Sequence, residues 1–133
     1  MYVEQAIDAS AHLPELIALA CTVPMRRTAS YISHPNETPP ALKTLARAIL
    51  QQPPTRTSVV TLLPMQQIPA HTDPPIHGKR FHLPLLVNDG CWSFSDGCWQ
   101  HLLPGRVYQV DPSLVHGAVN WGPTPRLHLL VDV

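Results

Sequence analysis

Two histidines and an aspartate carry the strongest chemical signal in the sequence. His71 and Asp73 are two residues apart, so in an extended segment both side chains point to the same side. His116 supplies a second imidazole later in the chain. Two histidines and one carboxylate on one face of a metal leave its other positions open, which is typical of non-haem iron(II) oxygenases. The sequence therefore predicts a metal site at His71, Asp73 and His116, with Arg126 facing the same cavity to hold an anionic cosubstrate.

Two Arg-x-His segments accompany this set. Arg80 and His82 are two residues apart, as are Arg126 and His128, so each pair shares one face of a strand. The opposite faces carry only apolar side chains, namely Phe81, Leu83 and Leu85 in one segment and Leu127 and Leu129 in the other. If those apolar faces pack on a neighbouring layer, the Arg-x-His faces look into the mouth of a barrel. A buried guanidinium needs an anion, which a bound carboxylate ligand would supply.

Other roles for single residues stay open at this level. Asp73 precedes two prolines and could simply form a turn. Arg126 could form an ion pair at the rim of a barrel. A lone histidine in a strand is more often a satisfied or exposed side chain than a metal ligand. The match between His71, Asp73 and His116 nevertheless favours the metal site.

The composition indicates a single globular domain over residues 1–133. The chain is 44% hydrophobic and 14% charged, and nine basic residues balance nine acidic ones. With a net charge of zero and no basic patch, nucleic acid is not an expected partner. No apolar stretch approaches the roughly 18 residues of a membrane span, and no signal peptide is visible. We therefore expect no membrane partner and a cytoplasmic protein.

The elements that would position the site change from helical to β near residue 55. Residues 1–54 are expected to form a helical covering segment, with helices over 11–20 and 40–51. Strands are expected over 57–68, 80–87, 98–103, 106–111, 115–120 and 126–133, with a further short strand around Trp92. Turn signals at 88–90 and 95–97 suit antiparallel neighbours. This pattern predicts a mainly β sandwich or barrel over 55–133, and closure into a jelly roll would bring His71 near His116.

The C-terminal half of the chain resembles the aspartyl/asparaginyl β-hydroxylase family of 2-oxoglutarate-dependent oxygenases. The resemblance follows the order His-Thr-Asp at 71–73, Arg-Phe-His-Leu-Pro-Leu at 80–85, a strand ending in Asp111, His-Gly-Ala-Val-Asn at 116–120, and Arg-Leu-His-Leu-Leu-Val-Asp at 126–132. It implies a double-stranded β-helix (jelly-roll, cupin-like) fold, an iron(II) site, and consumption of 2-oxoglutarate and O2.

By position, the resemblance implies that His71 and His116 are iron ligands and that Arg126 binds the distal carboxylate of 2-oxoglutarate. Arg80 and His82 would line the cosubstrate and substrate pocket, and Arg80 could serve either molecule. His128, on the same strand face as Arg126, joins the predicted cofactor-binding residues.

Asp73 departs from the best-known mammalian members, which carry glycine there. The full triad resembles bacterial members, including hydroxylases of free amino acids such as proline. The expected function is therefore hydroxylation of an amino acid, or of an aspartyl/asparaginyl-type residue in a peptide, with release of succinate and CO2. The expected partner is a small molecule or peptide with a carboxylate. The alternative is a cupin-like metal-dependent binding module without redox chemistry, which would have no need of Arg126.

Overall fold

In the described residues an N-terminal strand is followed by a 3-10 turn, two α-helices and then a series of short strands. In the computed structural model, which describes residues 1–23 and 38–133, the helices are a 3-10 turn (Ser10–His12), α1 (Leu13–Ala20) and α2 (Pro40–Leu50). The strands are β1 (Val3–Asp8), β2 (Arg56–Leu62), β3 (Gln67–His71), β4 (Arg80–Leu86), β5 (Cys91–Ser95), β6 (Cys98–Gln100), β7 (Arg106–Val110), β8 (His116–Asn120) and β9 (Arg126–Asp132).

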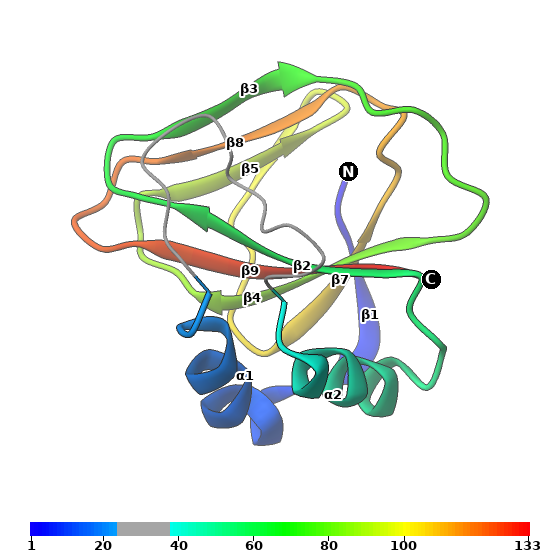
Figure 1. The fold of residues 1–133 in the computed structure, drawn as a ribbon. Helices are drawn as coiled ribbons and strands as arrows, with labels where there is room; N and C mark the ends of the chain where they lie inside the picture. The colour runs from blue at the N-terminus through cyan, green and yellow to red at the C-terminus, as the bar shows by residue number, and fades with distance from the viewer. Residues whose placement is uncertain (24–37) are drawn as a thin grey trace.

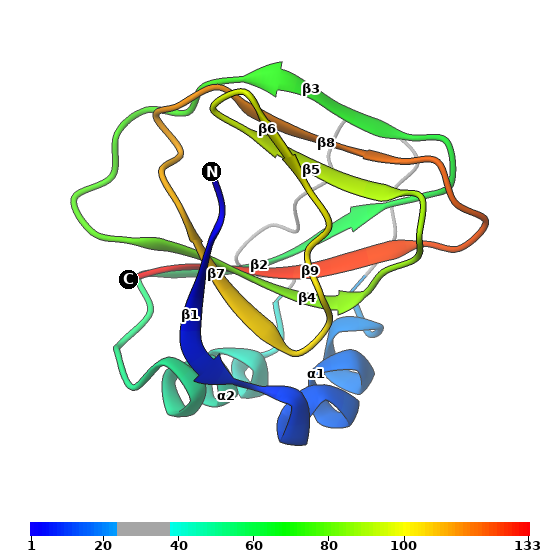
Figure 2. The same cartoon turned by 180° about the vertical axis from the view of Figure 1, so that it is seen from behind.

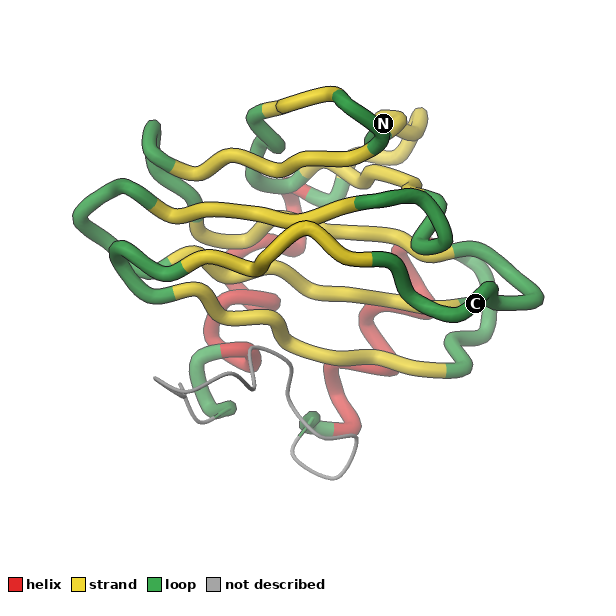
Figure 3. The backbone as a smooth tube through the Cα atoms, turned by 90° about the horizontal axis from the view of Figure 1, so that it is seen from above, coloured by secondary structure: helices red, strands yellow, loops and turns green. Residues whose placement is uncertain are grey.

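The strands form two facing sheets. One has the order β1-β7-β4-β9-β2 and the other β3-β8-β5-β6, and the pairings are antiparallel. The four-stranded sheet lies over one face of the five-stranded sheet, and both helices lie under the other face (Figure 1). Viewed from above, the strands of the two layers run in roughly the same direction (Figure 3). This two-layer arrangement leaves an interior between the sheets for the site.

The outer face of the five-stranded sheet is buried against the helices. On β9, Leu127 and Leu129 pack in one apolar cluster with Leu16 of α1 and Ala46 of α2. The same cluster contains Phe81, Leu83 and Leu85 of β4, the apolar residues expected on the outer face of that strand. Because side chains alternate along a strand, the arginines and histidines of β4 and β9 must face the interior. The predicted division of these two strands into an apolar and a polar face is therefore confirmed.

The expected helices and tight turns are present with small changes in their ends. Pro40 sits in the first turn of α2, where its missing N–H costs nothing, and Gln51 ends the helix in a left-handed conformation with φ 54°. Asp96 and Gly97 both have positive φ, 49° and 78°, and join β5 to β6. That is the geometry of the two-residue turn that Asp-Gly favours in hairpins.

Two predictions about the elements are wrong. Residues 1–54 are not a purely helical segment, because Val3–Asp8 forms β1, which pairs with β7 (Figure 2). Residues 57–68 are not one strand, because Pro64 and Met65, the latter with φ 66°, carry the chain from the five-stranded sheet into the other sheet. Residues 24–37 of the expected covering segment lie outside the described residues. No helix formed by residues 1–23 or 38–133 has the length and apolar character needed to cross a membrane.

Candidate metal and cosubstrate site

His71 and His116 are brought together by strand pairing. They are direct partners in the register of β3 and β8, and their ring centroids are 4.3 Å apart. Asp73 lies just beyond β3, where its backbone N–H donates to the carbonyl of Pro112 over 2.9 Å. One ligand atom from each of the three side chains lies within 4.8 Å of the others. The predicted triad is therefore a compact cluster, formed by segments far apart in the sequence.

Both imidazoles direct a lone pair at the carboxylate. Nδ1 of His71 is 2.7 Å from the carbonyl oxygen of Pro69, and Nδ1 of His116 is 2.8 Å from that of Leu114. A carbonyl oxygen can only accept, so each Nδ1 carries the proton and a neutral ring has its lone pair on Nε2. The Nε2 atoms of His71 and His116 lie 3.5 and 3.4 Å from the carboxylate oxygens of Asp73. Three acceptors thus face one another, which favours a cation among them.

Arg80 holds the carboxylate of this cluster from the side. Its Nη1 donates to Asp73 over 2.7 Å, while Nε and Nη2 donate to the two oxygens of Asp132 over 2.7 and 3.0 Å. Burial acts to lower the pKa of Arg80, but the bonds to Asp132 and Asp73 outweigh it and raise that pKa. The guanidinium is therefore matched by two carboxylates of the protein.

Arg126, unlike Arg80, is a buried arginine without a matching carboxylate in the described part of the chain. Its side chain is 2% exposed, and within the described part of the chain no carboxylate pairs with it. Nε lies 3.1 Å from Nε2 of His128, Nη2 lies 3.4 Å from the hydroxyl of Ser93, and Nη1 has no hydrogen-bond partner among residues 1–23 and 38–133. Burial lowers the pKa of Arg126. A buried cation with a free donor is chemically suited to an anion such as a carboxylate.

His128 and His82 stand behind and beside Arg126. Nδ1 of His128 is 3.3 Å from Nδ1 of His82. The same Nδ1 of His128 lies 2.9 Å from Nη2 of Arg126, so both ring nitrogens of His128 contact the guanidinium. Burial, followed by the charge of Arg126, lowers the pKa of both imidazoles well below the ordinary value. Both rings are therefore neutral at pH 7.

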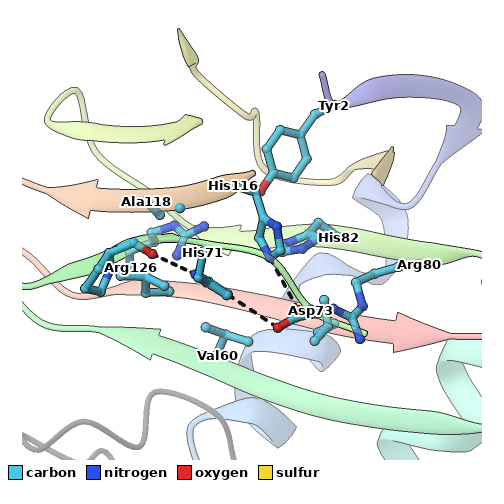
Figure 4. Close-up of a pocket in the computed structure, with 13 residues that line it drawn as sticks. Tyr2, Val60, His71, Asp73, Arg80, His82, His116, Ala118 and Arg126 are labelled. Carbon is cyan, nitrogen blue, oxygen red and sulfur yellow. Dashed lines mark hydrogen bonds and ion pairs between the residues drawn. The ribbon is translucent and has the colours of Figure 1, made fainter. Parts of the chain in front are cut away.

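These groups share one cavity of about 350 Å³ between the sheets. Figure 4 shows the triad at its centre, Arg80 to one side, Arg126 to the other, and Tyr2 entering from above. The rest of the lining is apolar or small: Val60, Ile68, Pro69, Gly117, Ala118 and Leu130. Polar groups that converge in an apolar pocket are typical of a small-molecule site.

The structure brings together six of the seven predicted site residues as lining of this cavity: His71, Asp73, Arg80, His82, His116 and Arg126. His128 is not part of the lining and contacts Arg126 from behind. The sequence interpretation missed Tyr2 and the role of Asp132. Asp132 shares the period-two face of Arg126 and His128, so alternation along the strand could have indicated it. Tyr2 precedes a strand that was not expected, and no local signal marks it.

Known proteins share both the sequence pattern and the fold. A family model described as Aspartyl/Asparaginyl beta-hydroxylase matches residues 22–133. L-proline cis-4-hydroxylase of Rhizobium meliloti (strain 1021) is 38% identical over 53 residues, which are 40% of this chain and 19% of that protein. The matched segment thus spans about a fifth of that relative's length.

Two solved structures resemble most of the chain. AviO1 from Streptomyces viridochromogenes Tue57 has a TM-score of 0.63 at 18% identity, over 98% of this chain and 88% of that one. An oxidoreductase of the 2OG-Fe(II) oxygenase family from Burkholderia pseudomallei has a TM-score of 0.60 at 13% identity, over 92% and 77%. These likenesses concern the fold, and the expected mainly β, double-stranded β-helix architecture is confirmed. Because the family model spans every strand from β2 to β9, the chain belongs to the aspartyl/asparaginyl β-hydroxylase family.

Proposed function

We propose that this protein is an iron(II)- and 2-oxoglutarate-dependent dioxygenase that hydroxylates an amino acid, or an aspartyl/asparaginyl-type residue in a peptide. The observation that carries the proposal is the convergence of Nε2 of His71, Nε2 of His116 and the Asp73 carboxylate, where each imidazole directs Nδ1 at a backbone carbonyl and leaves Nε2 toward the cluster. Family membership and the oxygenase-like fold support it.

The donor set fits iron(II). Two neutral imidazoles and one carboxylate on one side of a metal leave positions for a 2-oxo acid and dioxygen. Each imidazole is oriented by its own Nδ1–H bond to a backbone carbonyl, and Asp73 is oriented by Arg80. Such outer contacts fix ligand geometry and are part of a metal site. When bound, iron(II) with 2-oxoglutarate and O2 would supply the oxidising chemistry, releasing succinate and CO2.

The protein's own residues would bind and orient the reactants. Arg126, whose Nη1 has no hydrogen-bond partner in the described part of the chain, would hold the distal carboxylate of 2-oxoglutarate, for which its planar fork is suited. Neutral His82 would offer a further polar group in the same cavity. The apolar lining around Leu130 and Ala118 would keep water away from the reacting carbon.

The substrate would be a small molecule or a peptide side chain that bears a carboxylate. The named relative acts on L-proline, and Asp73 is consistent with that bacterial type of member. Arg80 is already matched by Asp73 and Asp132, so its two remaining N–H groups would offer a substrate carboxylate hydrogen bonds but little unbalanced charge.

Succinate release tests the proposal. The purified protein would be supplied with iron(II), 2-oxoglutarate and, in turn, free amino acids including L-proline, aspartyl peptides and small metabolites. We expect succinate in proportion to one hydroxylated product, and no turnover after His71→Ala, Asp73→Ala or His116→Ala. The control is His101→Ala, an exposed histidine outside the cavity, which should retain activity. Full turnover by His71→Ala would show that His71 is not a metal ligand needed for the reaction. If the protein binds metal but not 2-oxoglutarate, a cupin-like binding module without redox chemistry is favoured instead.

A further inference from the structure

Tyr2 is a buried residue that the N-terminal strand brings into the cavity. Its side chain is 3% exposed, and it precedes β1, the edge strand that pairs with β7. The side chain of Gln100 fixes its backbone at both ends: the Tyr2 N–H donates to Oε1 over 2.8 Å, and Nε2 donates to the Tyr2 carbonyl over 3.0 Å. This two-point attachment holds the Tyr2 backbone against the end of β6.

The Tyr2 hydroxyl is a donor without a protein acceptor in the described structure. The ring stands edge-on to His82, with 5.3 Å between centroids, and its hydroxyl is directed down toward the triad (Figure 4). The hydrogen bonds that Tyr2 forms with residues 1–23 and 38–133 use its backbone N–H and carbonyl, not this hydroxyl. Burial raises the pKa of Tyr2 despite the nearby charges of Arg126 and Arg80. The phenol is therefore protonated at pH 7 and able to donate.

Arg126 and Tyr2 each carry a hydrogen-bond donor that no described residue accepts. Arg126 is a buried cation whose Nη1 has no hydrogen-bond partner among residues 1–23 and 38–133, and within the same residues Tyr2 forms hydrogen bonds through its backbone and not through its hydroxyl. Both line the same cavity. One carboxylate could satisfy both groups, since each of its oxygens can accept more than one hydrogen bond. A buried carboxylate in turn needs several donors to offset the loss of hydration.

We propose that Tyr2 donates a hydrogen bond to the carboxylate held by Arg126, so that the N-terminal strand supplies part of the cosubstrate site. The inference rests on the proposed function and deepens it, because it adds a binding residue for the distal carboxylate of 2-oxoglutarate. It also gives β1 a role in the site: the strand anchors a donor as well as extending the sheet.

Calorimetry with two ligands tests the hydroxyl alone. Manganese(II)-loaded protein would be titrated with 2-oxoglutarate and with 2-oxobutanoate, which keeps the 2-oxo acid group and lacks the distal carboxylate. Tyr2→Phe removes only the hydroxyl and keeps the ring. We expect it to weaken 2-oxoglutarate binding by about tenfold, the effect of one hydrogen bond to a charged group, and to leave 2-oxobutanoate binding unchanged.

Tyr108→Phe is the matched control. Tyr108 belongs to the same buried cluster as Tyr2, but its hydroxyl accepts the Leu103 N–H over 3.0 Å and does not line the cavity. It should leave both affinities unchanged. Wild-type affinity for 2-oxoglutarate in Tyr2→Phe, or an equal loss for both ligands, would overturn the inference while leaving the proposed function standing. If the wild type itself does not distinguish the two ligands, the carboxylate assignment to Arg126 fails, and the role of Tyr2 fails with it.

Discussion

Arg80 and Asp132 face each other as direct partners on β4 and β9, joined by two parallel hydrogen bonds of 2.7 and 3.0 Å. The third bond from Arg80 reaches Asp73 over 2.7 Å. The geometry makes Arg80 a positioning residue for Asp73, because Asp132 fixes the plane of the guanidinium from the far side. A pair in the strand register thus determines how the carboxylate of the triad is aimed.

Replacing Asp132 by asparagine should weaken both the fold and the metal site. Both partners of the ion pair are largely buried, and removing one charge leaves Arg80 incompletely compensated. We expect the free energy of unfolding in urea to fall by about 3 kcal/mol. Manganese(II) affinity should fall as well, since Asp73 loses its fixed neighbour. Asp89→Asn, the same change at an exposed position, should alter stability by less than about 0.5 kcal/mol and leave metal affinity unchanged. Equal behaviour of the two variants would contradict the positioning role.

Replacing Arg126 by methionine should separate stability from function. The guanidinium is buried without a carboxylate, so an apolar side chain of similar length removes a costly charge. We expect the ligand-free variant to be about 1–3 kcal/mol more stable toward urea and to lose 2-oxoglutarate binding in calorimetry. Arg106→Met makes the same change at an exposed site on β7 and should do neither. A destabilised Arg126→Met would show that its contacts to His128 and Ser93 outweigh the cost of burying the charge.

The faces of β4 and β9 could be predicted from the sequence because a strand alternates with a period of two. Arg80 and Arg126 were placed inside, and Phe81 and Leu127 outside, before any pairing was known. The same period would have placed Asp132 inside, but its partner depends on the register between strands, which local sequence does not determine.

β1 could not be predicted for a related reason. Its sequence includes Glu4, Gln5 and Ala6, which favour helices, and its strand conformation comes from pairing with β7, far along the chain. Tyr2 is therefore a site residue that only the tertiary structure reveals. The break at Pro64, in contrast, has a clear local signal, since proline has no N–H to donate within a strand.

Stability should fall as the medium becomes more acidic than about pH 6.5. His82 and His128 have pKa values lowered well below the ordinary 6.5, mainly by burial and then by Arg126. Below that pH the unfolded chain takes up protons at both positions while the folded protein does not, so acid favours unfolding. Their contribution is complete above pH 6.5 and is lost as the pH falls toward the folded pKa values, by up to about 1.4 kcal/mol per pH unit for each histidine.

A variant series isolates this effect. Urea denaturation of His128→Gln between pH 7.5 and 5 should show a shallower dependence on pH than the wild type, because one of the two buried proton-uptake sites is absent. His12→Gln, at an exposed position, should follow the wild-type slope. A His128→Gln curve parallel to the wild type would mean that His128 is protonated in the folded protein or titrates normally there.

Gly117→Ala should spread the two strands that carry the histidines. A Cβ at this position would lie 2.7 Å from the carbonyl oxygen of Ile68 and 3.3 Å from the amide nitrogen of Ala70, so the backbone of β3 must move away from β8. His71 lies on β3 opposite His116, the neighbour of Gly117, and should move with the strand. We expect a loss of about 1–3 kcal/mol in unfolding free energy and a weaker affinity for manganese(II). Gly97→Ala is the contrast: with φ 78° it strains the β5–β6 turn at a cost of about 1 kcal/mol, but the added methyl meets no atom within 4 Å. The manganese(II) affinity of Gly97→Ala should equal that of the wild type. An equal loss of affinity in both variants would show that the site responds to overall stability rather than to the spacing of β3 and β8.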